Sequence, residues 1–323
     1  MAIHADARVG ARPRVGVPSC LLGSPVSCDG GRSRSRFLAD VLDRHVDWVP
    51  VCPEGGNGPG VLRERPRLER AGSGGRAASR SRADRTDDPR AASDRRFEAL
   101  DRLDGCVLKD EPPGCGLSGP PVDERPDPPV EEQGRLRDPG LRERFVERVF
   151  ARARLRALFA GARGDGAGPA PGGADEAGCA AWRPRELVAF HARNKLQLMA
   201  HSPEGYRATG RIAAEAGSRP PEEVRRDYTA AFTRALARPA SPGRNANALQ
   251  HAFGMISDRL DGARRRDLVD AVDRYREGLV PLSVPIDLIR YHADAASASW
   301  VREQTYLDPY PADLRLRDSP AAP

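Results

Sequence analysis

Lysine is scarce in this sequence. The chain of 323 residues contains 52 lysines and arginines together, yet only Lys109 and Lys195 are lysines. An ammonium is a compact point charge, whereas a guanidinium is a planar fork with a different hydration. Because nearly every other cation is arginine, the sequence indicates a specific need for an ammonium at these two positions. The alternative is that the two lysines remain by chance.

Long apolar runs are absent. No run approaches the roughly 20 residues that a membrane-spanning helix needs, and the Arg-containing N-terminus lacks a signal-peptide core. We therefore expect a cytoplasmic protein with no membrane partner. The six cysteines are widely and irregularly spaced, which in a reducing compartment favours thiols, metal ligands or catalytic groups over disulfides. The net charge of +6 permits a polyanionic partner without requiring one.

Two stretches lack the side chains that build a core. Residues 69–96 contain no large apolar side chain, so the segment cannot offset its ordering entropy and is predicted to be a mobile loop. Residues 161–181 consist mainly of Gly, Ala, Pro and Asp, which is typical of a linker. The sequence thus predicts a first domain over 14–160, a linker over 161–181 and a second domain over 182–317.

In the first domain, three short apolar runs each lead to a cysteine. RVGVP at 14–18 precedes Cys20, the run 46–51 precedes Cys52, and the run 106–109 leads through Pro and Gly to Cys115. Such runs read as buried strands, and helices are expected near 36–42, 97–103 and 137–159. This pattern predicts an α/β domain with a parallel sheet, where ligands collect beyond the carboxyl ends of the strands. The three cysteines either converge on one metal or cluster site or are unrelated buried thiols.

The second domain is predicted to be all-α. Helical periodicity marks five segments, at about 184–201, 204–216, 221–237, 245–260 and 264–278. On a helical wheel for 184–201, the buried side consists of Val188, Ala192, Leu196, Met199 and Ala200. Polar side chains gather on another arc of that helix and on one arc of the helix near 245–260, and these residues are His191, Asn194, Lys195 and His201, followed by Arg244, Asn247 and His251. Seven donor-rich residues on two arcs favour a phosphate or base surface of an RNA; the alternative is that they cap helices and satisfy the core.

Three blocks in the first domain resemble the signature of the thiouracil desulfidase family. They are CLLGSPVSCDGG at 20–31, VPVCPE at 49–54 and LDGCVLK followed by GCGL within 103–117. The second domain resembles the YbgA-type domain that often follows it, through ELVAFHARNKLQLMAHSPEGY at 186–206, NANALQH at 245–251, YREGLVPLSVPIDLI at 275–289 and QTYLDPYP at 304–311. Proteins of this two-domain kind are similar to desulfidases that act on 4-thiouridine in tRNA.

The resemblance implies a site and a reaction. Cys20, Cys52 and Cys115 become the ligands of a [4Fe-4S] cluster, which keeps one iron open for a soft sulfur atom. Glu54 becomes the catalytic acid/base, because a carboxylate within reach can relay a proton to or from water. Asp29, Arg63 and Lys109 are the candidate substrate-binding residues. The helical domain is expected to hold tRNA, with no DNA partner and with an unspecified sulfur acceptor.

The chain departs from the family pattern in places. Pro112-Pro113-Gly114 stands where the family usually has Ser-Pro-Ser, and Ser27-Cys28 replaces Arg-Tyr before Asp29. Cluster ligands are thus retained while some hydroxyls expected near the substrate are missing. Two alternatives stay open beside the tRNA desulfidase. One is a desulfidase for free thiouracil or its nucleotides, and the other is a catalytically impaired protein that binds a cluster and RNA.

Overall fold

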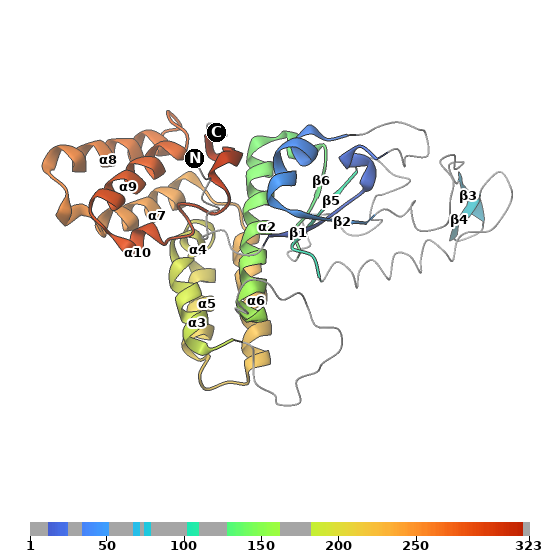
Figure 1. Cartoon of the computed structure of the whole chain (residues 1–323), viewed down its shortest axis with the longest axis horizontal. Helices are drawn as coiled ribbons and strands as arrows, with labels where there is room; N and C mark the ends of the chain where they lie inside the picture. Colours follow the sequence, from blue (N-terminus) through green and yellow to red (C-terminus); the bar gives the residue numbers. More distant parts are fainter. Residues whose placement is uncertain are drawn as a thin grey trace. The chain divides into compact units, whose positions relative to one another are not determined.

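The chain forms two compact units. The computed structural model describes residues 12–24, 34–51, 67–71, 74–78, 102–109, 128–161 and 182–318. These residues divide into Arg12–Asp138 and the part of the chain from Pro139 onward. The first unit is built around a sheet and the second is helical (Figure 1). Among the described helices, none is long and apolar enough to cross a membrane.

A four-stranded sheet forms the centre of the first unit. Its order is β2-β1-β5-β6, and every pairing is parallel. The strands are β1 (Arg14–Val17), β2 (Asp47–Pro50), β5 (Gly105–Leu108) and β6 (Val130–Glu132). The parallel α/β fold predicted for this part of the chain is confirmed. The sequence missed β6, because two of its three residues are glutamates and carry no apolar pattern.

Short helical turns follow the first strand. The 3-10 helix η1 (Ser19–Leu22) comes directly after β1 and ends at Gly23, whose φ of 98° is left-handed. The helix expected near 36–42 is present as a π-helix η2 (Phe37–Val41) followed by a 3-10 helix η3 (Leu42–His45). Leu38 and Leu42 are buried. One apolar residue per turn is therefore enough to anchor this short segment.

Gly16 lets the sheet pack closely. A Cβ at this position would lie 2.7 Å from Leu103 Cδ1 and 3.1 Å from both Cys106 Sγ and Val51 Cγ1. Overpacking of this kind in a core costs about 1–3 kcal/mol. We therefore expect Gly16→Ala to lower the free energy of unfolding by that amount, measured by urea denaturation. Gly243→Ala is the control, since a Cβ there meets nothing within 4 Å, and equal midpoints for the two variants would contradict the packing argument.

The stretch predicted to be a mobile loop contains two strands. β3 (Arg67–Ala71) and β4 (Gly74–Ala78) pair in antiparallel register, from Arg67 opposite Ala78 to Ala71 opposite Gly74. The prediction for 69–96 is wrong over these residues. The prediction considered apolar content alone. Two paired strands, however, satisfy each other's backbone N–H and C=O groups by hydrogen bonds, whatever their side chains are. Residues 72–73, between the two strands in the sequence, lie outside the described residues.

Proline sets the starts of many helices in the second unit. Pro184, Pro203, Pro221 and Pro242 each occupy the first turn of a helix, where the missing N–H is no loss. The helices are α2 (Pro139–Ala160), α3 (Pro184–Arg193), α4 (Lys195–His201), α5 (Pro203–Ala214), α6 (Pro221–Ala237), α7 (Pro242–Gly254), α8 (Gly262–Arg276), α9 (Ser283–Ala295) and α10 (Ser299–Arg302). Short 3-10 turns η7 (Ala312–Leu314) and η8 (Leu316–Asp318) close the described chain.

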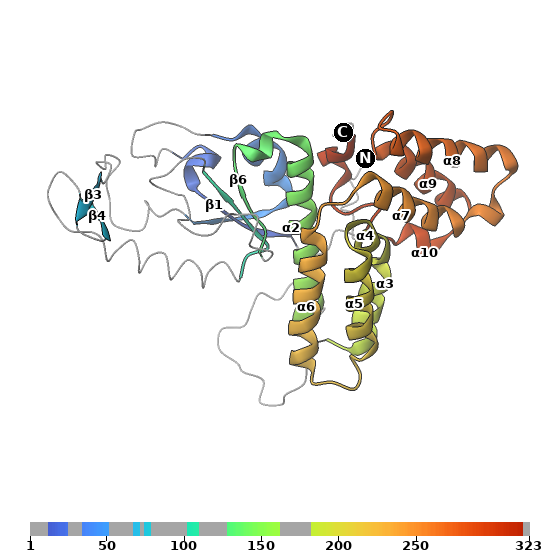
Figure 2. The ribbon, with the colours of Figure 1, turned by 180° about the vertical axis from the view of Figure 1, so that it is seen from behind.

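The helix expected over 137–159 exists as α2, but it belongs to the helical unit. The predicted domain boundary placed it with the first domain, ahead of the linker at 161–181. Instead Ala151 and Leu155 of α2 pack in one apolar cluster with Trp182, Leu187 and Tyr228. Helices α2 and α6 lie side by side in both views (Figures 1 and 2). The structural boundary between the two units falls at 138–139. Residues 162–181, which make up nearly all of the predicted linker, lie outside the described residues.

The single helix predicted over 184–201 is two helices. Asn194 has φ −95° and ψ 6° and separates α3 from α4. Val188 is 50% exposed and Ala192 is also exposed, although the helical wheel placed both on the buried side. Gln304 spans the break, because its Oε1 accepts from Leu196 N at 3.3 Å and its Nε2 donates to Ala192 O at 3.0 Å. The wheel failed because these contacts come from a residue far along the chain.

Candidate functional site

Of the predicted cluster ligands, the structure describes Cys20, which lies beyond the carboxyl end of β1. Cys20 follows β1 in η1 and is 3% exposed. Val51 N donates to Val17 O at 3.1 Å, so the chain that leads to Cys52 runs beside the chain that leads to Cys20. Strand β5, which precedes Cys115 in the sequence, pairs with the other side of β1. The predicted residues Asp29, Cys52, Glu54, Arg63 and Cys115 themselves lie outside the described residues.

Cys106 lies inside strand β5, whereas Lys109 follows the end of that strand. Lys109 is half-buried and directly follows β5. Cys106 is level with Gly16 inside the sheet, 1% exposed, and its Sγ lies 3.9 Å from Val107 O. Burial raises the pKa of Cys106 to about 12, so it remains a protonated thiol at neutral pH. The register therefore separates a core cysteine from the residues at the edge of the sheet.

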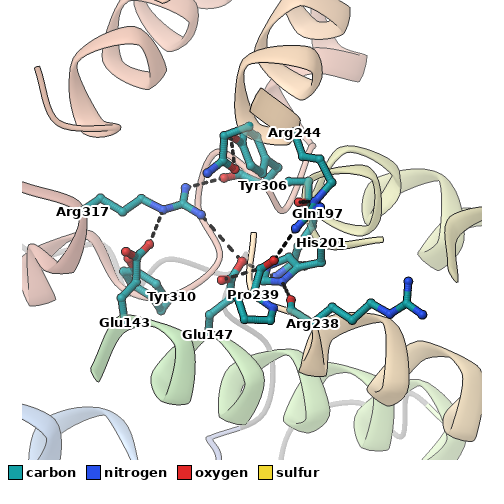
Figure 3. A network of polar contacts seen from close by, with 12 residues as sticks. Glu143, Glu147, Gln197, His201, Arg238, Pro239, Arg244, Tyr306, Tyr310 and Arg317 are labelled. Atoms are coloured by element: carbon teal, nitrogen blue, oxygen red, sulfur yellow. Dashed lines mark hydrogen bonds and ion pairs between the residues drawn. The ribbon is translucent and has the colours of Figure 1, made fainter. Parts of the chain in front are cut away.

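Glu147 of α2 is the centre of a buried polar network in the helical unit (Figure 3). Its Oε1 accepts from Gln197 Nε2 at 2.8 Å, and its Oε2 lies 3.2 Å from His201 Nε2. Arg317 Nη2 is 3.7 Å from Oε1. Burial alone would raise the pKa of this carboxyl, but the charges and hydrogen bonds of His201, Arg317 and Gln197 lower it to about 2. Glu147 is therefore a buried carboxylate.

His201 is the cationic partner of that carboxylate. It is 3% exposed, and its Nδ1 lies 2.7 Å from Arg238 O. A carbonyl oxygen and a carboxylate both accept, so both ring nitrogens donate, which requires the imidazolium form. Burial disfavours that form, yet Glu147 outweighs burial and raises the pKa of His201 above its ordinary value. His201 and Glu147 thus form a buried ion pair.

Arg317 ties the end of the described chain to α2. Its Nε donates to Glu143 Oε1 at 2.8 Å, and its Nη1 donates to Tyr306 O at 2.6 Å. The Tyr310 hydroxyl donates to the same Glu143 oxygen at 3.0 Å. The guanidinium also lies 5.3 Å from the centre of the Tyr306 ring, a cation–π arrangement. Figure 3 shows Arg317 between the two glutamates of α2.

A second set of buried bonds joins blocks that are far apart in the sequence. Asn245 of α7 donates from Nδ2 to the Tyr275 hydroxyl at 2.8 Å and accepts from the Tyr306 hydroxyl at 3.0 Å. Three of the blocks that carry the YbgA-type resemblance therefore meet at one amide. Sequence reasoning missed Glu143, Glu147, Gln197 and Arg317. The only available signal was the pair of glutamates one turn apart on a helix whose other charged residues are arginines.

Three of the seven predicted RNA-binding residues serve the fold. Asn194 is 1% exposed and its Nδ2 donates to Phe190 O at 2.8 Å. His201 lies in the buried ion pair. Arg244 is half-buried and donates to Ala200 O at 3.1 Å and to Pro239 O at 2.6 Å. These side chains satisfy backbone carbonyls and a buried charge, which is the alternative that the sequence left open.

The other four reach the surface in two places. Asn247 and His251 are exposed one turn apart on α7. His191 and Lys195 are half-buried at the junction of α3 and α4. Burial and the neighbouring Lys195 lower the pKa of His191, so it is neutral at pH 7. The predicted surface is thus reduced to two pairs of residues.

Metal-ligating side chains do not gather elsewhere in the described part of the chain. Within it, no three His, Cys, Asp or Glu residues lie close enough to hold a metal ion. The cysteines at 28, 52, 115 and 179 lie outside it.

Comparison with known proteins identifies both units. Residues 15–134 match the family model described as 2-thiouracil desulfurase, and residues 195–311 match the model described as a protein of unknown function (DUF1722). A curated relative is the uncharacterized protein YbgA of Escherichia coli strain K12, which is 29% identical over 134 residues, or 41% of this chain and 79% of the relative. No solved structure matches. The chain is therefore similar, part by part, to a 2-thiouracil desulfurase domain followed by a DUF1722 domain of the YbgA type.

Proposed function

We propose that the chain is a [4Fe-4S]-dependent desulfidase that removes sulfur from thiolated uracil, with 4-thiouridine in tRNA as the substrate. The family match of residues 15–134 supports the desulfidase activity. The observation that carries the proposal is the strand order β2-β1-β5. Three adjacent parallel strands run toward Cys52, Cys20 and Cys115, which are widely separated in the sequence, and one edge of one sheet would collect them.

The donor set fits the cluster. Thiolates are soft ligands that suit iron–sulfur centres, and buried Cys20 already lies beyond the end of β1. Lys109 follows β5 at the same edge of the sheet, and a nearby cation favours the thiolate form of cysteine. Cytoplasmic location, which the proposal includes, would keep these thiols reduced. When bound, the cluster supplies an iron atom with an open position as a Lewis acid for the thiocarbonyl sulfur.

The reaction is a hydrolysis. Water adds to the ring carbon, the C=S bond becomes C=O, and sulfur leaves as hydrogen sulfide, so no electrons are exchanged. In this scheme Glu54 takes a proton from the attacking water and returns it to the departing sulfur. Lys109, Asp29 and Arg63 hold the base. Asp29, Glu54 and Arg63 enter the scheme from the family resemblance alone.

Glu54→Gln tests the acid/base role. We expect this variant to load iron like the parent and to lose sulfide release by at least about a hundredfold, because an amide fills the same space but takes no proton. Iron content and methylene-blue sulfide assays on anaerobically prepared protein measure the two effects. Sulfide release at the parent rate would remove Glu54 from the reaction.

An observation in the helical unit favours a second candidate function, a desulfidase for free thiouracil or its nucleotides. Asn194, His201 and Arg244 are occupied inside the fold, which leaves less surface for RNA than the sequence predicted. Rates of sulfide release from tRNA that contains 4-thiouridine and from free 4-thiouracil separate the two. A higher kcat/KM on tRNA supports the proposal. Release from the free base only would favour the second candidate, and iron loading without release from either would favour an impaired protein.

A further inference from the structure

Four half-buried side chains of the helical unit form a continuous row, Tyr206–His191–Lys195–Trp300, which we call the aromatic–cation row. The ring of His191 is stacked on Tyr206 at 5.3 Å between centroids and with 4° between planes. Lys195 follows His191 across the break at Asn194, and its charge contributes to lowering the pKa of His191. Its Nζ lies 5.6 Å from the centre of the Trp300 ring. The row thus links α5, α3, α4 and α10.

Contacts with other residues of the helical unit hold part of this row in place. His191 Nδ1 lies 3.2 Å from the hydroxyl of buried Tyr228. Gly210 leaves room for the ring, because a Cβ there would come within 3.3 Å of His191 Nε2. Gln304 fixes the chain break that carries Lys195 through its bond from Leu196 N. The His191 ring and the chain break that carries Lys195 are therefore held in place by the fold, which reduces the entropy cost of binding a partner.

The cations along the row have no acidic partner. Lys195, Arg207 and Arg211 form no ion pair with any residue that the structure describes, and Arg207 and Arg211 are exposed on α5. On neighbouring α6, by contrast, Arg225 pairs with Glu222 and Arg226 with Asp227. Unneutralised cations beside half-exposed aromatic rings suit a ligand that alternates anionic groups with flat rings. A nucleic acid strand has this chemistry.

We propose that the aromatic–cation row binds unpaired nucleotides of an RNA, with bases against Tyr206 and Trp300 and phosphates at Lys195, Arg207 and Arg211. This inference rests on the tRNA part of the proposed function. Unpaired nucleotides are favoured over a duplex because the faces of paired bases are hidden within the stack, whereas splayed bases stack on aromatic side chains. The partner is thus a loop or single-stranded segment.

The test uses the full chain and a labelled oligouridylate of about twelve nucleotides, a length within the usual range for single-strand sites. We expect Trp300→Leu to weaken binding by about tenfold or more, because stacking on one base contributes about 1–3 kcal/mol. Lys195→Gln and Arg207→Gln should each flatten the dependence of log K on log salt by about 0.7, the value for one phosphate contact on a single strand.

Two matched controls lie away from the row. Tyr291→Leu removes an aromatic ring that is 68% exposed on α9, and Arg276→Gln removes an exposed arginine at the end of α8. Both should bind oligouridylate like the parent. Equal weakening of oligouridylate binding by Tyr291→Leu and Trp300→Leu would overturn the inference. So would a parent chain that binds duplex RNA or polyglutamate as tightly as oligouridylate, because the row would then be a general patch of positive charge.

Sulfide release from free 4-thiouracil, measured on the same variants, separates this inference from the proposed function. Unchanged release with weakened oligouridylate binding supports both. Release from free thiouracil by a parent chain that does not bind oligouridylate overturns the row as an RNA site and leaves the desulfidase. Row-dependent RNA binding by a chain that releases no sulfide from any substrate leaves the row and overturns the desulfidase.

Discussion

Cys20→Ser should abolish iron loading and sulfide release, whereas Cys106→Ser should retain both. The two cysteines are matched in burial, since both are buried in the same unit, Cys20 in η1 directly after β1 and Cys106 in β5, which pairs with β1. They differ in their position relative to the ends of the strands. Cys20 follows the end of β1, where the chain leading to Cys52 lies alongside, while Cys106 is inside β5 and level with Gly16.

The chemistry of the two thiols reinforces this difference. A metal ligand must be a thiolate, and burial in an apolar part of the sheet raises the pKa of Cys106 to about 12. Serine at 106 buries a hydroxyl in place of a thiol, which lowers stability but removes no metal ligand. Serine at 20 replaces a soft donor with a hard one that iron–sulfur centres rarely accept. Cys52→Ser and Cys115→Ser should behave like Cys20→Ser, and Cys28→Ser and Cys179→Ser like Cys106→Ser.

Anaerobic reconstitution followed by iron and acid-labile sulfide analysis gives the result for each variant. Far-UV circular dichroism shows whether each variant is folded before iron is measured. The parent chain should carry four irons per protein if the cluster is complete, by the definition of a [4Fe-4S] centre. If Cys20→Ser and Cys106→Ser lost iron equally while folded, the assignment of Cys20 as a ligand would fail.

Glu147→Gln should lower the free energy of unfolding by about 3–5 kcal/mol, which is the usual effect of removing one partner from a buried ion pair. The amide would leave imidazolium His201 and guanidinium Arg317 close together without their shared carboxylate. Most domains have a stability of only about 5–15 kcal/mol, so the helical unit of this variant should be close to unfolding. Urea denaturation followed by helical circular dichroism measures the change.

The same pair predicts a dependence of stability on pH. The pKa of Glu147 falls from 4.5 to about 2 in the folded chain, so its contribution is full above 4.5 and is lost as pH falls toward 2. The pKa of His201 is raised from 6.5, so its contribution is full below 6.5 and is lost as pH rises through the folded value. The pair therefore stabilises the fold most between about 4.5 and 6.5, and Glu147→Gln should flatten that maximum.

Glu204→Gln is the matched control. Glu204 pairs with Arg238 at 3.2 Å, but the two side chains are 75% and 62% exposed, and exposed pairs contribute about 0–1 kcal/mol. The same chemical change should therefore have little effect on the surface. A Glu147→Gln variant as stable as Glu204→Gln at every pH would show that the buried network contributes nothing to the fold.

Local patterns predicted much of this fold. The runs before Cys20 and Cys52 were recognised as strands because they are apolar and bounded by Pro, and α6 has the bounds that its periodicity indicated, 221–237. The sequence predicts no helix over Ser283–Ala295, the residues of α9. Pro285 is only the third residue of that helix, where the ring is tolerated because no helical hydrogen bond is lost.

The site residues were harder to predict, because their partners lie far away in the sequence. His201 reads as a surface donor on a helical wheel, but its partner Glu147 is on α2, 54 positions earlier. The break at Asn194 depends on Gln304, 108 positions after Leu196. Conversely, the helix predicted over 264–278 ends at Arg276, and Leu279 beyond it is 65% exposed. Periodicity describes one element at a time and cannot register such contacts.

Helix α2 changes what counts as a module in this protein. It lies between the two family matches, which end at 134 and begin at 195, yet it supplies Ala151 and Leu155 to the helical core and both glutamates to Arg317. A fragment that begins within residues 161–181 would lack α2. Its apolar core would be exposed, and the buried cations His201 and Arg317 would lose their carboxylate partner Glu147. Anyone excising the helical half for binding studies, or grafting it onto another protein, should begin at Pro139.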